Sequence, residues 1–291
     1  MSQLSRSAGI ALAALGLALI HPAQAQTTVT YAQDDASAYT TGFVGAGTNP
    51  NTVTQSNHGT GFNPFVFKSS SGNFAGWYLQ SGNTAIGTGT GQNTLGIYAS
   101  TDATTTATRS FDFSPDGVTP IVPGATTPLL TGQTLNASFQ NRDIATGHSV
   151  GFSLADSTGA ALFTFDFLGG TSNYRFTDGT GTTTSSLGYT QGGLNTSFLL
   201  TGANAYTFTT TRLSDSAFSS QSGTFTGAID RIVYFCNGSS NNGDVNFSAL
   251  SITGPAAAAA PEPSQMAVLA ICALGLGGLM LARRRQNMRL A

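Results

Sequence analysis

The carboxylates of this chain are unevenly distributed, and this limits the acid–base chemistry that the protein can perform. Of the thirteen acidic residues in 291, twelve are aspartates, and the single glutamate, Glu262, lies between Pro261 and Pro263. A pair of carboxylates acting on a glycosidic bond within residues 26–254 would therefore have to be two aspartates. Hydrolysis of a polysaccharide is a weaker expectation than a function without catalysis.

Motifs for other enzymatic chemistry are incomplete. The segment from Gly151 to Ala155 approaches a nucleophile elbow around Ser153, but its fifth residue is alanine and it lies in an alternating strand pattern. The glycines of residues 87–91 have the wrong spacing for a phosphate-binding loop. His58 and His148 have no partner at zinc-ligand spacing. We therefore predict that the chain is not an enzyme and has no cofactor.

Two kinds of ligand stay open. Aspartates in or beside expected loops could hold a structural calcium ion, although aspartate is also an ordinary turn residue. These aspartates are Asp34, Asp35, Asp143, Asp156, Asp178 and Asp244. Trp77, the only tryptophan, and its neighbour Tyr78 could present a flat apolar surface to a glycan. The alternative is that Trp77 belongs to the core, as most aromatic side chains do.

The C-terminal segment combines an apolar run with a basic end. The run from Met266 to Ala282 carries no charge over seventeen residues, which as a helix would be about 25 Å long, at the short end of what spans a bilayer. Arg283, Arg284 and Arg285 follow, and such basic flanks stay on the cytoplasmic side. We predict a single transmembrane helix at residues 265–282 and a cytoplasmic tail at residues 283–291, with the body across the membrane.

The N-terminus indicates export independently of the C-terminus. Arg6 precedes a 13-residue apolar stretch from Ala8 to Ile20, and Ala23 and Ala25 form a small-x-small cleavage site. We predict that residues 1–25 are a signal peptide removed by signal peptidase after Ala25. A retained N-terminal anchor, the alternative, would need a longer apolar stretch.

The C-terminal segment resembles the PEP-CTERM sorting signal of exported proteins in Gram-negative bacteria. The resemblance rests on Pro261-Glu262-Pro263, the following Ser264, the apolar run and the arginines 283–285. It implies that an exosortase, a membrane transpeptidase, recognises the Pro-Glu-Pro element and removes the helix and tail. It also implies an inner-membrane precursor, release or attachment at the cell surface or extracellular matrix, and an association with exopolysaccharide and biofilm.

Residues 26–254 show the apolar alternation of β-strands almost throughout, with turn residues between the strands. We predict one antiparallel β-sandwich of jelly-roll type at residues 26–254, followed by a Pro/Ala linker with the sorting element at residues 255–264. The clearest strands alternate around Ala137, Phe152, Phe165, Tyr174 and Phe208. Other strands are expected at Thr28–Ala32, Phe62–Lys68, Phe74–Leu79, Leu95–Ala99 and Arg109–Phe113.

The last two expected strands resemble the closing hairpin of concanavalin A-like jelly rolls. The first, from Ile229 to Cys236, is apolar on both parities, which predicts a central strand covered on both faces. The second runs from Asp244 to Ile252 and changes parity between Phe247 and Leu250, which predicts a bulge near Ser248. Cys236 is the only cysteine of the body, so it has no partner there for a disulfide and is expected in the core.

The net charge of residues 26–260 limits the classes of partner that we expect. Residues 26–260 carry six basic residues against twelve aspartates, a net charge of −6, and the basic residues are scattered singly. A nucleic-acid-binding surface needs clustered basic residues, so nucleic acid is not an expected partner. The leading hypothesis is a non-enzymatic matrix protein. The alternatives are a lectin-like carbohydrate-binding module and, less favoured, a polysaccharide hydrolase.

The sorting hypothesis predicts a specific role for Glu262. We expect Glu262→Ala to leave the protein in the membrane with its C-terminal segment uncleaved, because the only carboxylate of the recognition element is lost. Leu279→Ile, the control, keeps the apolar run and should be processed normally. Intact mass spectrometry of the protein from its native host reads the outcome, and equal processing of both variants would contradict the hypothesis.

Overall fold

The protein is described by a computed structural model that covers residues 27–39, 43–45, 51–70, 74–100, 102–115, 124–142, 144–238 and 244–256. The predicted signal peptide, the sorting element Pro261–Ser264, the transmembrane helix and the arginines 283–285 lie outside these residues. Within the covered residues, no helix has the length and apolar character to cross a membrane.

The first sheet has eight antiparallel strands, seven of them in one continuous order. That order is β14 (Phe218–Thr224), β13 (Ala205–Arg212), β12 (Leu194–Gly202), β7 (Thr134–Asn141), β16 (Asp244–Pro255), β5 (Thr94–Ala99) and β4 (Ala75–Gln80). The eighth strand, β1 (Thr28–Asp34), pairs with the C-terminal half of β16, beyond the part that pairs with β5.

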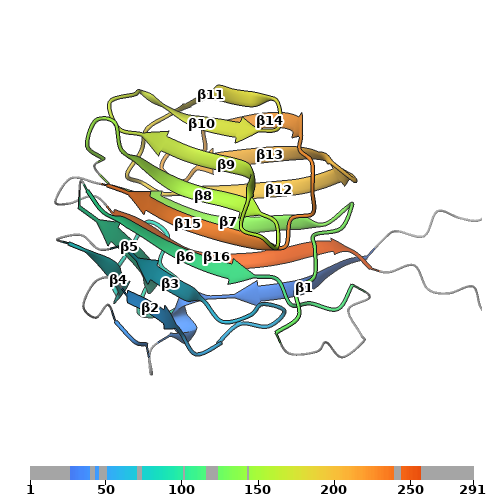
Figure 1. The fold of residues 1–291 in the computed structure, drawn as a ribbon, viewed down its shortest axis with the longest axis horizontal. Coiled ribbons are helices and arrows are strands. Elements are labelled where there is room, and N and C mark those ends of the chain that lie inside the picture. The colour runs from blue at the N-terminus through green and yellow to red at the C-terminus, as the bar shows by residue number, and fades with distance from the viewer. Residues whose placement is uncertain are drawn as a thin grey trace, which may run out of the picture. The chain divides into compact units, whose positions relative to one another are not determined.

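The second sheet also has eight antiparallel strands and faces the first (Figure 1). Its order is β11 (Gly181–Gly188), β10 (Asn173–Asp178), β9 (Ala161–Leu168), β8 (Ser149–Ala155), β15 (Arg231–Asn237), β6 (Thr104–Ser110), β3 (Val66–Ser69) and β2 (Asn51–Thr54). The only helical element among the described residues is a short 3₁₀ turn, η1 (Ala36–Ala38). The predicted class, an all-β antiparallel sandwich, is confirmed.

Aromatic side chains fill the space between the two sheets. Each strand places alternate residues on its inner face. The inner residues of β9 are all phenylalanine, and β7, β8 and β13 each add one phenylalanine. Phe165 lies at the centre, with ring centroids of Phe152 at 5.8 Å and Phe208 at 5.1 Å. Nearer β16, Tyr234 of the second sheet stacks on Phe247 of the first at 4.0 Å. These contacts join the sheets into one core.

A buried ion pair also connects the sheets. Arg109 on β6 is 0% exposed, and its Nη2 lies 2.9 Å from Oδ2 of Asp34 on β1. The Tyr39 hydroxyl donates to the same carboxylate oxygen at 2.7 Å and accepts from Arg109 Nη1 at 3.0 Å. Asn57 Oδ1 accepts from Arg109 Nη2 at 2.8 Å. Because removing one partner of such a pair leaves a buried charge, this cluster ties β1 firmly to the second sheet.

Three expectations about individual strands need correction. The last two strands are not a hairpin, since β15 lies in the second sheet and β16 in the first. β15 is central, but only its inner face is buried; Val233 and Phe235, on the outer face, are half-buried. The strand expected at Arg109–Phe113 begins earlier, as β6 at Thr104, and ends at Ser110.

Another expectation is confirmed in β16. Its register against β7 shifts between Phe247 and Leu250, as the parity change predicted. Val245 and Phe247 face the core before this bulge, whereas Leu250 and Ile252 face it afterwards. The bulge therefore turns Ser251 and Thr253 to the outer face of the first sheet.

The aromatic core predicts that replacing two different phenylalanines by alanine will change the free energy of unfolding by very different amounts. We expect Phe165→Ala to lower the free energy of unfolding by about 3–5 kcal/mol, because it removes a fully buried ring. Phe74→Ala, the matched control, removes a ring that is 60% exposed and should cost about 1 kcal/mol or less. Urea denaturation of residues 26–256 measures both values. Similar costs for the two variants would contradict this packing.

Candidate functional site

The outer face of the first sheet carries a straight row of amide and hydroxyl side chains. Strand register places Gln33 (β1) opposite Ser251 (β16), Ser251 opposite Asn136 (β7), and Asn136 opposite Ser197 (β12). Ser197 is in turn opposite Thr209 (β13), and Thr209 is opposite Ser220 (β14). We call these six residues the central row. The row crosses six neighbouring strands without a charged residue.

Two further rows flank the central row. On one side, register aligns Thr30, Thr253, Thr134, Leu199, Thr207 and Ser222. On the other side, it aligns Ser138, Asn195, Thr211 and Phe218. Side chains alternate between the two faces of a strand, so the residues held in the core fix the residues between them on the outer face. The result is a field of uncharged polar groups with two apolar members, Leu199 and Phe218.

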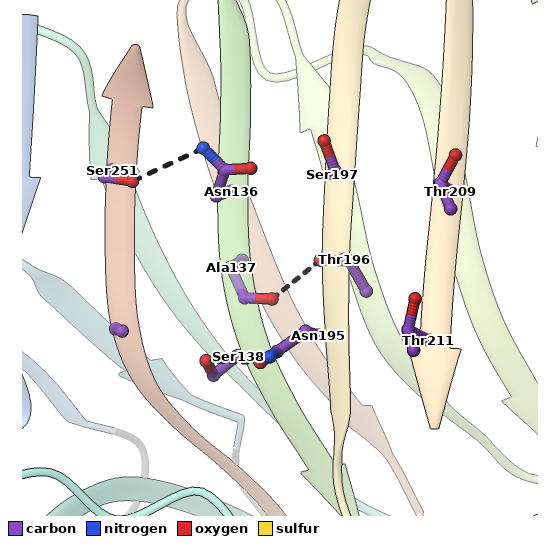
Figure 2. A pocket seen from close by; sticks show the side chains of 10 residues that line it. Asn136, Ala137, Ser138, Asn195, Thr196, Ser197, Thr209, Thr211 and Ser251 are labelled. Carbon is purple, nitrogen blue, oxygen red and sulfur yellow. Dashed lines mark hydrogen bonds between the residues drawn. The ribbon is translucent and has the colours of Figure 1, made fainter. Parts of the chain in front are cut away.

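An open hollow of about 310 Å³ lies over this field. Figure 2 shows its labelled side chains on four adjacent strands, β16, β7, β12 and β13. Ser138 Oγ donates to Asn195 Oδ1 at 3.0 Å, and Asn136 Nδ2 donates to Ser251 Oγ at 3.5 Å. The lining residues are Asn136, Ala137, Ser138, Asn195, Thr196, Ser197, Thr209, Thr211, Ala249 and Ser251. The hollow thus offers both donors and acceptors and no charge.

A second hollow of about 420 Å³ adjoins the first across β16 and shares Ala249 and Ser251 with it. Asp34, Asp35 and His58 line it. Burial raises the pKa of Asp34 and the Arg109 guanidinium opposes that rise, while the carboxylate is already bonded by Tyr39. Partial burial acts to raise the pKa of Asp35, but hydrogen bonds from Thr88 and Ser37 outweigh it and leave that pKa lowered. Both carboxylates are thus engaged within the protein.

Trp77 and Tyr78, considered from the sequence as a sugar platform, are engaged by the protein itself. Trp77 is 2% exposed, and its Nε1 donates to the Val44 carbonyl at 2.9 Å. This is the core alternative, and it removes the ring face that a sugar would need. Tyr78 is half-buried on the outer face of β4, and its hydroxyl donates to Asp244 Oδ2 at 2.5 Å. Burial and the Asp244 carboxylate raise the Tyr78 pKa.

The described aspartates among those considered for calcium do not form a metal site. No group of three or more His, Cys, Asp or Glu side chains that could hold a metal ion occurs in the part of the chain that the structure describes. Asp156 accepts backbone and hydroxyl hydrogen bonds from Thr158 in its own turn. Asp178 does the same with Thr180 and also accepts from Tyr206. Asp143 lies outside the described residues.

Phe218 was not among the residues expected at a site. It is 67% exposed, lies on the edge strand β14, and stands opposite Thr211 at the border of the hollow. Its strand escaped prediction because Ser219, Ser220, Gln221 and Ser222 give no apolar alternation. The flat ring is the type of surface on which sugar CH groups stack.

Comparison with known proteins gives a limited result. No family model matches the chain, and no curated protein matches it. A solved protein of unknown function from Shewanella oneidensis MR-1 is 14% identical, with a TM-score of 0.45 over 86% of this chain and 95% of that one. The CBM2 module of the evolved Dit of Lactobacillus casei BL23 phage J-1 is also 14% identical, with a TM-score of 0.39 over 63% and 92%. These similarities are too weak to carry an argument about a ligand.

The buried position of Trp77 predicts how its fluorescence responds. We expect acrylamide to quench the emission of folded residues 26–256 only weakly, because the indole is enclosed between Val44 and Phe67. In urea the same emission should be quenched several times more strongly. Equal quenching in both states would show that the ring is exposed and would restore it as a sugar platform.

Proposed function

We propose that this chain is an exported, non-enzymatic polysaccharide-binding protein of the cell surface or extracellular matrix. The observation that carries the proposal is the central row with its two flanking rows, an uncharged field of hydroxyl and amide groups under an open hollow. Sugar hydroxyls both donate and accept hydrogen bonds, and the hydroxyl and amide side chains of the rows do the same. The field therefore complements a glycan.

The dimensions of the field favour a polymer over a small sugar. The central row crosses six strands, and neighbouring strands are about 4.8 Å apart, so the row is about 24 Å long. The hollow is open, which suits a chain that continues beyond it at both ends. Phe218 at the border provides an apolar ring for stacking, and Ser197 and Thr211 have side chains that make no hydrogen bond within the described residues.

The charge of the surface indicates which polysaccharide it accepts. No lysine, arginine or aspartate lines the first hollow, so carboxylate or sulfate groups on a glycan would find no positively charged partner there. The net charge of −6 over residues 26–260 also disfavours an anionic polymer. A neutral polysaccharide is the class of ligand that fits. The same absence of carboxylates from the hollow supports binding without hydrolysis, since glycosidases work with an acid and a base.

The proposed route to the cell surface rests on the two ends of the chain. Signal peptidase would cleave after Ala25 and the exosortase would act at Pro261–Ser264, while residues 265–282 hold the precursor in the inner membrane. The exopolysaccharide of the producing cell is the natural first ligand to test, because PEP-CTERM proteins are associated with it. Polysaccharide binding depends on the first sheet and sorting depends on the C-terminal segment, so each can be tested without the other.

Single substitutions test the binding face. We expect Asn195→Ala to weaken binding of residues 26–256 to the producing cell's neutral exopolysaccharide about tenfold, as the loss of one or two hydrogen bonds implies. Asn136→Ala should weaken it similarly. Asn237→Ala, the matched control, removes an exposed amide from the second sheet and should have no effect. Affinity electrophoresis in gels containing the polysaccharide measures all three.

Salt provides an independent readout. Binding should change little between about 0.05 and 0.5 M salt, because ionic screening acts on charge pairs and the hollow offers none. Equal binding by Asn195→Ala and Asn237→Ala, or a steep loss of affinity with salt, would contradict this binding face.

A further inference from the structure

The edge strand β14 lacks the usual protection against pairing with another strand. Edge strands are normally guarded by charged residues, proline, a bulge or a short length. β14 has the sequence Phe-Ser-Ser-Gln-Ser-Gly-Thr over seven residues, with no charge and no proline. Its register against β13 runs from Thr224 to Phe218 without a shift. In the part of the chain that the structure describes, no strand pairs with its outer side.

The hydrogen-bond pattern shows which backbone groups of β14 point outward. The Arg212 amide donates to Ala217 and the Phe225 amide donates to Asn204, at 2.7 and 3.0 Å. Hydrogen-bonded and non-hydrogen-bonded pairs alternate along an antiparallel ladder. Since Ala217 and Phe225 are both in hydrogen-bonded pairs, every second residue between them, Ser219, Gln221 and Gly223, also bonds through its backbone to β13. The amide and carbonyl groups of residues 218, 220 and 222 therefore face away from the sheet.

One end of this outer side is already occupied. The Gly179 amide, in the turn between β10 and β11, donates to the Thr224 carbonyl at 3.2 Å. β11 is the edge strand of the second sheet, and it lies beside β14, the edge strand of the first (Figure 1). The residues of β11, Gly-Thr-Thr-Thr-Ser-Ser-Leu-Gly, are also uncharged. The side chains of Phe218, Ser220 and Ser222 are nevertheless exposed, and no charged residue on either edge strand would repel a second copy.

We infer that β14 pairs with β14 of a second copy of this chain, antiparallel about a two-fold axis at Ser220. In this pairing Ser220 lies opposite Ser220 of the second copy, and Phe218 lies opposite its Ser222. These three positions carry the outward amides and carbonyls, so the ladder is complementary to itself, as a two-fold interface requires. The pairing covers part of the Phe218 ring, which is 67% exposed in one copy.

The pairing has a consequence for the outer face. Because Ser220 ends the central row, its alignment with Ser220 of the second copy joins the two rows into one across both sandwiches. A long polysaccharide could then contact both copies at once, which raises the apparent affinity without any new contact. The dimer itself does not rest on polysaccharide binding, and its test contains no polysaccharide.

Ser220→Pro is the direct test. Proline removes the outward amide at the two-fold axis, and it is tolerated on an edge strand where that amide faces solvent. Residues 26–256 contain every described strand and the whole described core, so they are the protein to use. Sedimentation velocity over a concentration series should show a dimer for the wild type and for Ser220→Ala, which keeps the amide. Ser220→Pro should stay a monomer at the same concentrations.

A second variant keeps the test decisive if proline disturbs folding. Ser220→Lys places two positive charges face to face at the axis and should also give a monomer, with the dimer partly regained at high salt. Thermal unfolding of each variant checks that the sandwich is intact. A wild type that is monomeric at every concentration overturns the inference, and so does a dimer that Ser220→Pro and Ser220→Lys both retain.

Discussion

The two-residue period of the strands, shifted by a bulge in β16 and by another in β1, is the constraint on which the proposed site depends. Before the bulge, Val245 and Phe247 face the core; after it, Leu250 and Ile252 do. Without the extra residue, Ser251 and Thr253 would point inward and two large aliphatic side chains would lie on the outer face. The polar rows of the first sheet therefore exist because the core fixes the register on both sides of this bulge.

The central row of the first sheet is uncharged, although charged residues lie at the ends of its strands. Ion pairs on or beside the second sheet join Arg175 with Asp166 and Arg231 with Asp230. Ion pairs at the strand ends of the first sheet join Arg142 with Asp244 and Arg212 with Asp215. The central row of the first sheet carries amide and hydroxyl groups alone. Packing of the aromatic core does not require the outer row to be uncharged. An uncharged polar row is what the proposed binding of a neutral polysaccharide requires.

The sequence allowed the sandwich to be predicted, because apolar residues recur at every second position in β8 and β9. The parity change around Ser248 even located the bulge. The partners of β15 and β16 could not be predicted, because apolar residues on both parities suit a central strand of either sheet. β14 was missed because serine and glutamine dominate it. The site was missed for a related reason: its rows come from six strands far apart in the chain, and only register brings them together.

The most direct test of the account is to map the ligand on the sheet itself. Amide chemical shifts of isotope-labelled residues 26–256 would be followed while oligosaccharide fragments of the producing cell's neutral exopolysaccharide are added. The account predicts that shifts change at Asn136, Asn195, Ser197, Thr209 and Thr211, and stay constant on the outer face of β8 and β15. Changes confined to the second sheet or to the loops, with the rows unaffected, would contradict it.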